Sequence, residues 1–468
     1  MKKSLFTLSL CLIGMQVLSK SVSALPTDFT RTTWVTGMAS PLAMRFTPDG
    51  RLFYNEEGGK VRIIKNGVIL PTPFITLPTF AAHRESMVGI AIDPNFAQNG
   101  YIYVDYLFDE GGGKQQCRVS RITASKTNPD VAEPGSEIIL LSKMTEGGYT
   151  GGALTFGKDG MLYIGTAHGG SQDSSKLYGK ALRINPNTYP NVIPADNPFV
   201  NRPGFRPEIY ALGFREPFTG TTDTVTGNVV FNDVGEGGPE EVDSLIKGAN
   251  FGYEAGCEGN CAKPGMTNPW INLPKPGLVP SGCITGGTFY YGKSLPSTYR
   301  GSYFFADYDF SSIAVRSSTG TVSKFDQTTD KIIQLEVSPI DGAIYLLKIE
   351  GEQPPWKGSI QKIAYTGVLS INDLNRNAQF GPENTLLNAS QQNLSFMLGN
   401  QNVKSASLIV YSSNGVIVDQ INTQASDSHL NWNFNRASLK SGVYFYALKV
   451  LGNNGNAQEK KGQLFFLN

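Results

Sequence analysis

The chain has 468 residues, of which 17% are charged and 40% hydrophobic, and its 40 lysines and arginines nearly balance its 39 aspartates and glutamates. This composition excludes a disordered or collagen-like chain, and the length predicts several domains or one large core. A net charge of +1 gives no electrostatic reason to expect a nucleic acid or an anionic membrane as a partner. The 52 glycines and 11% aromatic residues indicate many turns between β-strands. We therefore expect an all-β protein with a small or neutral partner.

Residues 1–24 have the pattern of a secretory signal peptide. Lys2 and Lys3 precede an apolar run over residues 5–17, and Val22-Ser23-Ala24 fits the small-x-small cleavage pattern. The apolar run is too short to span a bilayer, so no membrane span is predicted. A buried helix would not explain the basic start. We expect a mature protein that begins at Leu25 and is secreted, periplasmic or extracellular.

Four cysteines remain once Cys11 leaves with the signal peptide: Cys117, Cys257, Cys261 and Cys283. An even count in an oxidising compartment predicts two disulfides, with three possible pairings. We favour a bridge within the Gly/Pro-rich region that holds the last three cysteines. A metal site is the alternative, but Cys-x3-Cys without a nearby pair of histidines is poor zinc spacing.

Six turn signals, each followed by alternating apolar residues, divide the first three quarters of the chain. They are Asp49-Gly50, Asn99-Gly100, Asp159-Gly160, Thr226-Gly227, Arg300-Gly301 and Asp341-Gly342. Glycine in such a pair tolerates the positive φ of a tight hairpin turn. Six similar β-units favour a six-bladed β-propeller over residues 25–366, in which the blades bury their faces on each other. An array of β-sandwiches is the alternative.

The composition changes near residue 366. Residues 367–388 read as a polar linker, and residues 389–468 as a separate small Ig-like β-sandwich with β-like runs over 394–398, 407–421, 430–434, 442–450 and 463–466. Residues 408–418 and 441–447, with Trp432, resemble the Ig-like C-terminal modules of secreted bacterial proteins, including type IX secretion sorting domains. An accessory or adhesion module is the alternative.

No phosphate-binding loop and no GxSxG nucleophile elbow is present, and three histidines are too few for a poly-His metal centre. Several segments instead resemble the glucose/sorbosone dehydrogenase family, which includes pyrroloquinoline quinone (PQQ)-dependent aldose sugar dehydrogenases and shares its propeller with the Hedgehog-interacting-protein-like group. The segments are 88–103 (VGIAIDPNFAQNGYIY), 151–163 (GGALTFGKDGMLY), 179–186 (GKALRINP), 193–199 (IPADNPF), 207–217 (PEIYALGFREP), 233–235 (DVG), 240–243 (EEVD), 248–252 (GANFG) and 284–292 (ITGGTFYYG). The resemblance implies the six-bladed propeller.

The resemblance also implies a catalytic pair. In the family, a His two residues before a Gly-Gly pair takes the proton of the sugar hydroxyl while hydride passes to the quinone, and a downstream Asp orients this His. The matching positions hold Tyr149 and His168. A free Tyr would need roughly 4 kcal/mol to exist as tyrosinate at pH 7. We therefore expect His168 to be the effective base beside Tyr149; the alternative is a chain that has lost the chemistry, with Tyr149 filling space.

The family's cofactor contacts match Arg84, Arg215 and Glu216. Arg84 stands where the family has Gln, and Arg215-Glu216 where it has Arg-Asn. The planar fork of Arg215 suits a carboxylate of PQQ. Glu216 would weaken an anionic ligand unless Arg84 or Lys348 compensates. Local salt bridges at a loop rim are the alternative reading of this pair.

For calcium, the resemblance implies Glu241 and the main-chain carbonyl of Phe251, and oxygen ligands of these kinds are what Ca²⁺ selects. The alternative is a hydrogen-bonded turn. Together these features predict a quinoprotein that oxidises the C1 hydroxyl of an aldose and passes electrons to an external acceptor. The alternative function is a non-catalytic extracellular propeller that binds carbohydrate or protein.

Overall fold

The computed structural model describes residues 25–56, 58–79, 86–111, 114–144, 151–274, 282–292, 294–351, 356–367, 381–382, 386–387, 393–398, 403–424, 429–434, 439–453 and 457–466. The predicted signal peptide lies outside these residues. Among them, no helix is long and apolar enough to cross a membrane.

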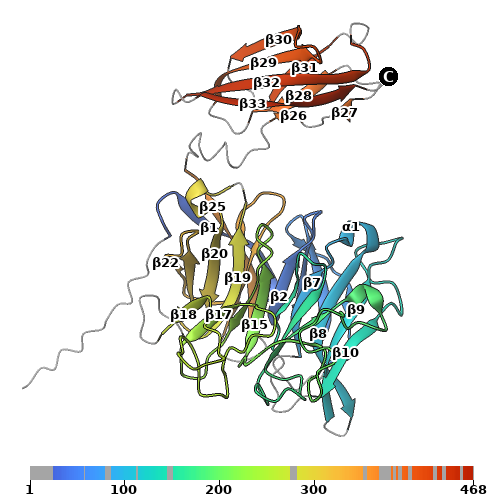
Figure 1. The fold of residues 1–468 in the computed structure, drawn as a ribbon, viewed down its shortest axis with the longest axis vertical. Helices are drawn as coiled ribbons and strands as arrows, with labels where there is room; N and C mark the ends of the chain where they lie inside the picture. The colour runs from blue at the N-terminus through green and yellow to red at the C-terminus, as the bar shows by residue number, and fades with distance from the viewer. Residues whose placement is uncertain are drawn as a thin grey trace, which may run out of the picture.

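Within the described ranges, the first 365 residues form six antiparallel sheets, which are the blades of a propeller (Figure 1). Blades 1 to 3, each from its inner strand outward, are β2 (Pro41–Phe46), β3 (Leu52–Glu56), β4 (Lys60–Lys65), β5 (Val68–Ile69) and β6 (Ile75–Thr76); β7 (Met87–Ile92), β8 (Tyr101–Gly111), β9 (Lys114–Thr123) and β10 (Ile138–Met144); and β11 (Leu154–Phe156), β12 (Leu162–Thr166), β13 (Lys180–Ile184) and β14 (Ile209–Leu212). Blades 4 to 6 are β15 (Pro217–Thr222), β16 (Val229–Asp233), β17 (Glu240–Ser244) and β18 (Ile271–Leu273); β19 (Ile284–Tyr290), β20 (Ser302–Asp307), β21 (Ser312–Arg316) and β22 (Val322–Gln327); and β23 (Lys331–Val337), β24 (Ile344–Glu350), β25 (Lys357–Tyr365) and β1 (Phe29–Ala39). Short helices lie at α1 (Phe96–Asn99), η1 (Pro186–Thr188) and η2 (Ser297–Tyr299).

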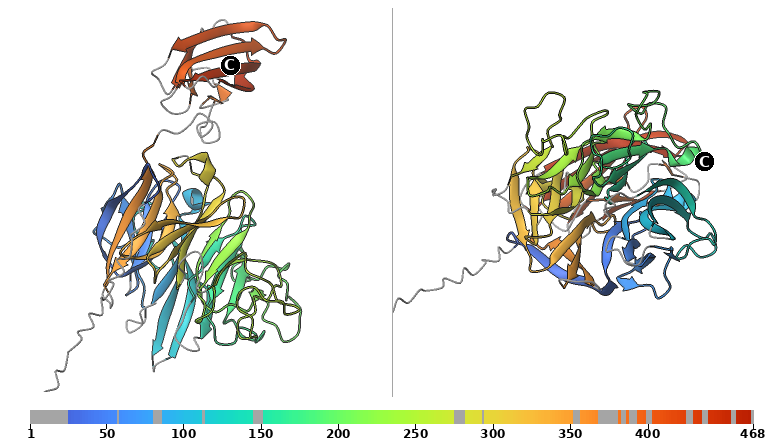
Figure 2. Two further views of the ribbon diagram at one scale, coloured as in Figure 1. Left: turned by 90° about the vertical axis from the view of Figure 1, so that its left-hand side faces the viewer. Right: turned by 90° about the horizontal axis from the view of Figure 1, so that it is seen from below.

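The inner strands close a ring: β2 contacts β7, β7 contacts β11, and so on through β15, β19 and β23 back to β2. The right-hand view of Figure 2 shows the blades around a common axis. Blade 6 combines both ends of the propeller sequence, because the N-terminal strand β1 pairs antiparallel with β25, from Phe29 opposite Tyr365 to Ala39 opposite Lys357. Main-chain hydrogen bonds between the two ends of the propeller sequence thus hold the ring shut.

The six predicted turns all lie where the sequence placed them, between the inner and the second strand of each blade. Their glycines have φ between +65° and +87°, which L side chains rarely adopt. Second strands such as β3, β12, β16 and β20 are buried along their whole length, because neighbouring blades cover both faces. The six-bladed all-β prediction is confirmed.

The C-terminal part has two sheets around one core. The smaller sheet holds β26 (Gly381–Pro382), β28 (Asn393–Met397) and β31 (His429–Asn433); the larger holds β27 (Leu386–Leu387), β33 (Ala457–Phe466), β32 (Gly442–Gly452), β29 (Val403–Ser412) and β30 (Ile417–Gln424). Phe396 and Trp432 of the smaller sheet pack with Leu408 and Leu448 of the larger in one buried cluster. This arrangement is a β-sandwich. The predicted run over 407–421 is two strands, which a turn at Gly415 (φ +84°) separates.

The disulfide prediction is half right. Cys257 and Cys261 form a bridge in the predicted region, but Cys117 and Cys283 remain thiols. Cys117 lies on β9 of blade 2, and Cys283 directly precedes β19 of blade 5. These blades lie three places apart in a ring of six, which is the largest separation that the ring allows, so a second bridge is sterically impossible.

Candidate functional site at one end of the propeller

The predicted site residues gather at the end of the propeller where the inner strands begin, which we call the top face. Antiparallel pairing brings the start of each inner strand to the end of its neighbour, the second strand. Arg215 and Glu216 directly precede β15, His168 follows β12, Lys348 lies near the end of β24, and Glu241 is the second residue of β17. Tyr149 and Arg84 lie outside the described residues.

His168 and Arg215 are joined through the backbone. The His168 amide donates a hydrogen bond of 2.6 Å to the Arg215 carbonyl. The His168 ring lies edge-on to Tyr253, with 5.8 Å between ring centroids, and the Tyr253 hydroxyl donates to Glu236 at 2.7 Å. The structure therefore adds Tyr253 and Glu236, which we did not identify in the sequence, although Tyr253 directly follows the family segment 248–252.

Only some of the hydrogen-bond donors of the Arg215 guanidinium are engaged by described residues. Its Nη1 donates to the Val234 carbonyl at 2.9 Å and lies 3.6 Å from the Glu216 carboxylate, while Nε is buried without a partner among the described residues. Burial raises the pKa of Glu216 above its usual range, which favours the neutral acid. The repulsion that Glu216 would exert on an anionic ligand is reduced accordingly. Lys348 forms an ion pair with Asp330 and is buried.

A buried ammonium group holds the loop that follows His168. Lys180 is fully buried, and its Nζ donates to the carbonyls of Gly170 (2.7 Å), Ser171 (3.1 Å) and Tyr178 (2.5 Å). Burial lowers the pKa of Lys180 to about 8. The carboxylate of Glu254 accepts the Ser171 amide at 2.7 Å. These contacts fix the backbone on which His168 sits.

Below the top face, three carboxylates meet inside blade 4. Asp233 of β16 stands opposite Glu241 of β17, and Asp243 lies two residues further along β17 on the same face. One oxygen from each carboxylate lies within 4.8 Å of the other two, and all three residues are buried. Glu241 is the predicted calcium ligand; Asp233 and Asp243 belong to family segments quoted above but were not predicted as ligands.

The hydrogen bonds of this acid cluster are incomplete. Asp233 accepts the amides of Arg215 (2.9 Å) and Glu216 (2.5 Å), and Glu241 accepts the Gly259 amide. Neither carboxylate oxygen of Asp243 has a partner within the described part of the chain. Buried carboxylates without donors are costly unless they hold a proton or contact a cation.

The pKa values of the cluster are displaced in the direction that burial dictates. Burial and the neighbouring Glu241 raise the pKa of Asp233 well above its usual range, and burial with the charges of Glu241 and Asp233 does the same for Asp243. Burial raises the pKa of Glu241 to about 7. The Phe251 ring packs in one apolar cluster with Phe231, which lies two residues before Asp233 on the same face of β16. The predicted carbonyl ligand thus belongs to a residue beside the acid cluster.

A cavity of about 220 Å³ opens next to Glu216 at the top of the ring. Its walls come from the inner strands and from the loops above them, and they are mostly apolar: Leu42, Phe218, Ile333 and Trp356 are among them. The indole Nε1 of Trp356 is buried without a partner among the residues that the structure describes. The cavity offers mostly apolar walls beside one acid, Glu216, a composition typical of small-molecule sites.

Comparisons with known proteins agree with this architecture. A sequence model of the family described as Glucose / Sorbosone dehydrogenase matches residues 38–354. The aldose sugar dehydrogenase YliI of Escherichia coli is 28% identical over 251 residues, which cover 52% of this chain and 67% of that protein. The human Hedgehog-interacting protein is 28% identical over 210 residues, 39% of this chain and 30% of that protein. The solved PQQ-bound form of an aldose sugar dehydrogenase from Streptomyces coelicolor covers 73% of this chain and 100% of its own with a TM-score of 0.58 at 18% identity, a likeness of fold. The chain therefore belongs to the glucose/sorbosone dehydrogenase family.

Proposed function

We propose that this protein is a secreted quinoprotein sugar dehydrogenase that oxidises the C1 hydroxyl of an aldose and passes the electrons to an external acceptor. Membership of the family and the relative named as an aldose sugar dehydrogenase support the reaction class. The observation that carries the proposal is the backbone chain from Asp233 through Arg215 to His168, because it would tie the proposed cation site, the predicted cofactor arginine and the predicted base together.

PQQ fits the residues of the top face. PQQ carries carboxylates, and the fork of Arg215 has a buried Nε without a partner among the described residues. When bound, PQQ supplies a quinone that accepts hydride. The residues of the chain would do the rest: Arg215 holds a carboxylate, with Arg84 and Lys348 as further predicted cations, and His168 beside Tyr149 takes the proton from the C1 hydroxyl. The apolar walls near Glu216 exclude water.

Calcium fits the acid cluster. Asp233, Glu241 and Asp243 supply carboxylate oxygens, and the carbonyl of Phe251 is a further candidate ligand. Neither carboxylate oxygen of Asp243 has a hydrogen-bond partner in the part of the chain that the structure describes, so a bound cation would balance its charge. A cation there would also fix the Asp233 carboxylate that accepts the amides of Arg215 and Glu216. Calcium in this role positions Arg215 and Glu216, the predicted cofactor contacts, from the interior of blade 4 beneath the top face.

The test is reconstitution of the mature chain with PQQ and Ca²⁺, with calorimetric titration of PQQ and dye reduction on a panel of aldoses. We expect PQQ to bind, sugar to reduce the dye, and EDTA to lower both signals. His168→Ala should lower the turnover rate at least 100-fold, as loss of a general base does, while His429→Ala in the sandwich should leave the rate unchanged.

The second candidate is a non-catalytic extracellular propeller that binds carbohydrate or protein. It is favoured by the Glu216 carboxylate, which lies 3.6 Å from the guanidinium that the cofactor needs, and by the relative named Hedgehog-interacting protein. No binding of PQQ at submillimolar concentration, with or without Ca²⁺, would contradict the dehydrogenase and support this reading.

A further inference from the structure

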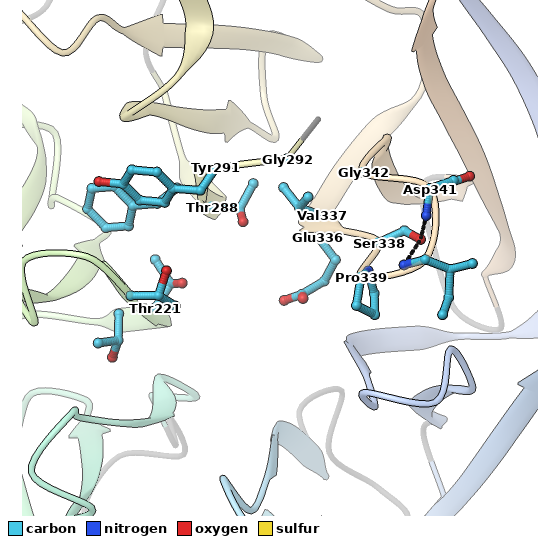
Figure 3. A pocket seen from close by; sticks show the side chains of 14 residues that line it. Thr221, Thr288, Tyr291, Gly292, Glu336, Val337, Ser338, Pro339, Asp341 and Gly342 are labelled. Atoms are coloured by element: carbon cyan, nitrogen blue, oxygen red, sulfur yellow. Dashed lines mark hydrogen bonds between the residues drawn. The ribbon is translucent and has the colours of Figure 1, made fainter. Parts of the chain in front are cut away.

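A second hollow lies at the opposite end of the propeller and has a volume of about 610 Å³. It is lined by the far ends of β15, β19 and β23, whose near ends line the cavity beside Glu216. The turn over residues 338–342 between β23 and β24 forms one wall (Figure 3). The two hollows are therefore at opposite ends of the same three strands.

Arg45 separates the two hollows. From β2 it forms an ion pair with Glu336 of β23, and its Nη2 donates to the Gly220 carbonyl of β15 at 2.8 Å. Beside it, the Gln334 side chain donates to the Met44 carbonyl at 2.9 Å. Arg45 thus crosses the centre of the ring at the level of Glu336, so the second hollow is a site of its own and not the far mouth of the first.

The lining of the second hollow mixes polar and apolar groups and carries no unbalanced charge. The carboxylate of Glu336 pairs with Arg45, and that of Asp341 pairs with Lys362 at 2.6 Å. An anion would meet these two carboxylates, and a cation would find both already paired. Net electrostatics therefore favour a neutral ligand.

Hydroxyl groups and aromatic rings remain for that ligand. Thr221 and Thr288 line the hollow, and their hydroxyls make no hydrogen bond to any residue that the structure describes. Phe289 and Tyr291 also line it. Figure 3 shows Thr221 and Tyr291 on one side, the turn with Ser338 and Asp341 on the other, and Glu336 between them. An alkyl ligand would leave these polar groups without partners, whereas a ligand rich in hydroxyls would satisfy them.

We propose that this hollow is a second, non-catalytic binding site for a short neutral oligosaccharide. Sugar rings present hydroxyls at their edges for Thr221, Thr288 and the Glu336 carboxylate, and apolar C–H faces for Phe289 and Tyr291. The volume lies within the range of about 300–1,000 Å³ that is usual for ligand sites. The protein would hold a glycan at one end while the other end binds its own substrate.

The experiment uses the full mature chain without PQQ, so its result is independent of the proposed dehydrogenase function. Maltotriose, cellotriose and xylotriose are titrated by saturation-transfer NMR and calorimetry. We expect at least one to bind, and the double variant Thr221→Val/Thr288→Val to bind at least tenfold more weakly, at about fivefold for each lost hydrogen bond. Valine keeps the shape and strand propensity of threonine, and Thr32→Val on the exposed face of β1 is the matched control.

A second variant, Tyr291→Leu, removes an aromatic ring from a partly exposed position and should also weaken binding. Dye reduction by a reconstituted enzyme should be the same for the double variant and the wild type. The proposal is overturned if none of the three sugars binds at millimolar concentration, or if the double variant binds as tightly as the Thr32→Val control.

Discussion

Replacement of Asp243 by asparagine tests the acid cluster directly. The cluster oxygens lie within 4.8 Å of one another, and two full charges at that distance repel by about 3.5 kcal/mol at an effective dielectric constant near 20. Asparagine keeps the shape of the side chain and removes two of the three repulsive pairs. The gain is smaller than the sum of these two repulsions, because the folded wild type already relieves part of the repulsion by holding protons on the carboxylates. We expect the metal-free variant to gain about 2 kcal/mol in free energy of unfolding at pH 8, or a few degrees in Tm.

The dependence on pH has a definite sign. Burial raises the pKa of Glu241 to about 7 and the pKa values of Asp233 and Asp243 well above their usual range. Between about pH 4 and these raised values, the folded state holds protons that the unfolded chain has released. The stability of the metal-free wild type therefore falls as the pH rises through this window, and it is greatest below it.

Calcium should reverse that loss by replacing the protons. At 100 times its dissociation constant, it would add about 2.7 kcal/mol to the free energy of unfolding, with a larger rise in Tm at pH 8 than at pH 5. Asp243→Asn should abolish most of this rise. Differential scanning calorimetry of both proteins at the two pH values, in EDTA and in Ca²⁺, measures the effects of pH, calcium and the substitution on stability. A wild type that does not respond to calcium at pH 8, or a variant that is less stable than the wild type in EDTA, would refute the reasoning.

Three further predictions concern the rest of the site. His168→Ala should lower sugar-dependent dye reduction at least 100-fold without a change in PQQ affinity, and equal losses in His429→Ala would show that the effect is not local. Lys180→Met removes the ammonium that donates to the carbonyls of Gly170, Ser171 and Tyr178, so urea titration should show a loss of about 3 kcal/mol in the free energy of unfolding; an unchanged midpoint would mean that the ammonium does not hold the loop. Alkylation of the denatured, unreduced chain from residue 25 onward should label Cys117 and Cys283 only, as read by mass spectrometry. In the native protein Cys283 should react slowly, because burial raises the pKa of its thiol well above the usual value. A chain with no reactive thiol would contradict the single disulfide.

Local signals were enough to predict the propeller. Each blade contains one recognisable turn signal, and a turn such as Asp159-Gly160 depends on the backbone freedom of its own glycine and not on distant residues. The same holds for the sandwich, where alternating apolar residues such as Phe396 and Leu408 point to one core. The run over 407–421 was predicted as a single β-like segment, because the turn at Gly415 was not recognised.

The site depended on contacts that no local pattern carries. Residues 248–253 run beside β14 through hydrogen bonds such as Phe251 to Leu212 and Tyr253 to Gly213, and this path brings Tyr253 to the ring of His168. The pairing of β16 with β17 likewise sets Asp233 opposite Glu241.

The sequence by itself determined the six blades and the family, because turn glycines and motif segments act over a few residues; His168 as base and Arg215 as cofactor contact stay predictions. Only the tertiary structure decided that Asp243 joins the acid cluster with no donor to its carboxylate among the described residues, that Lys348 pairs with Asp330, and that Cys117 cannot reach Cys283. The physical reason is that burial, charge pairing and cysteine partners depend on which blades and loops become neighbours once the ring closes.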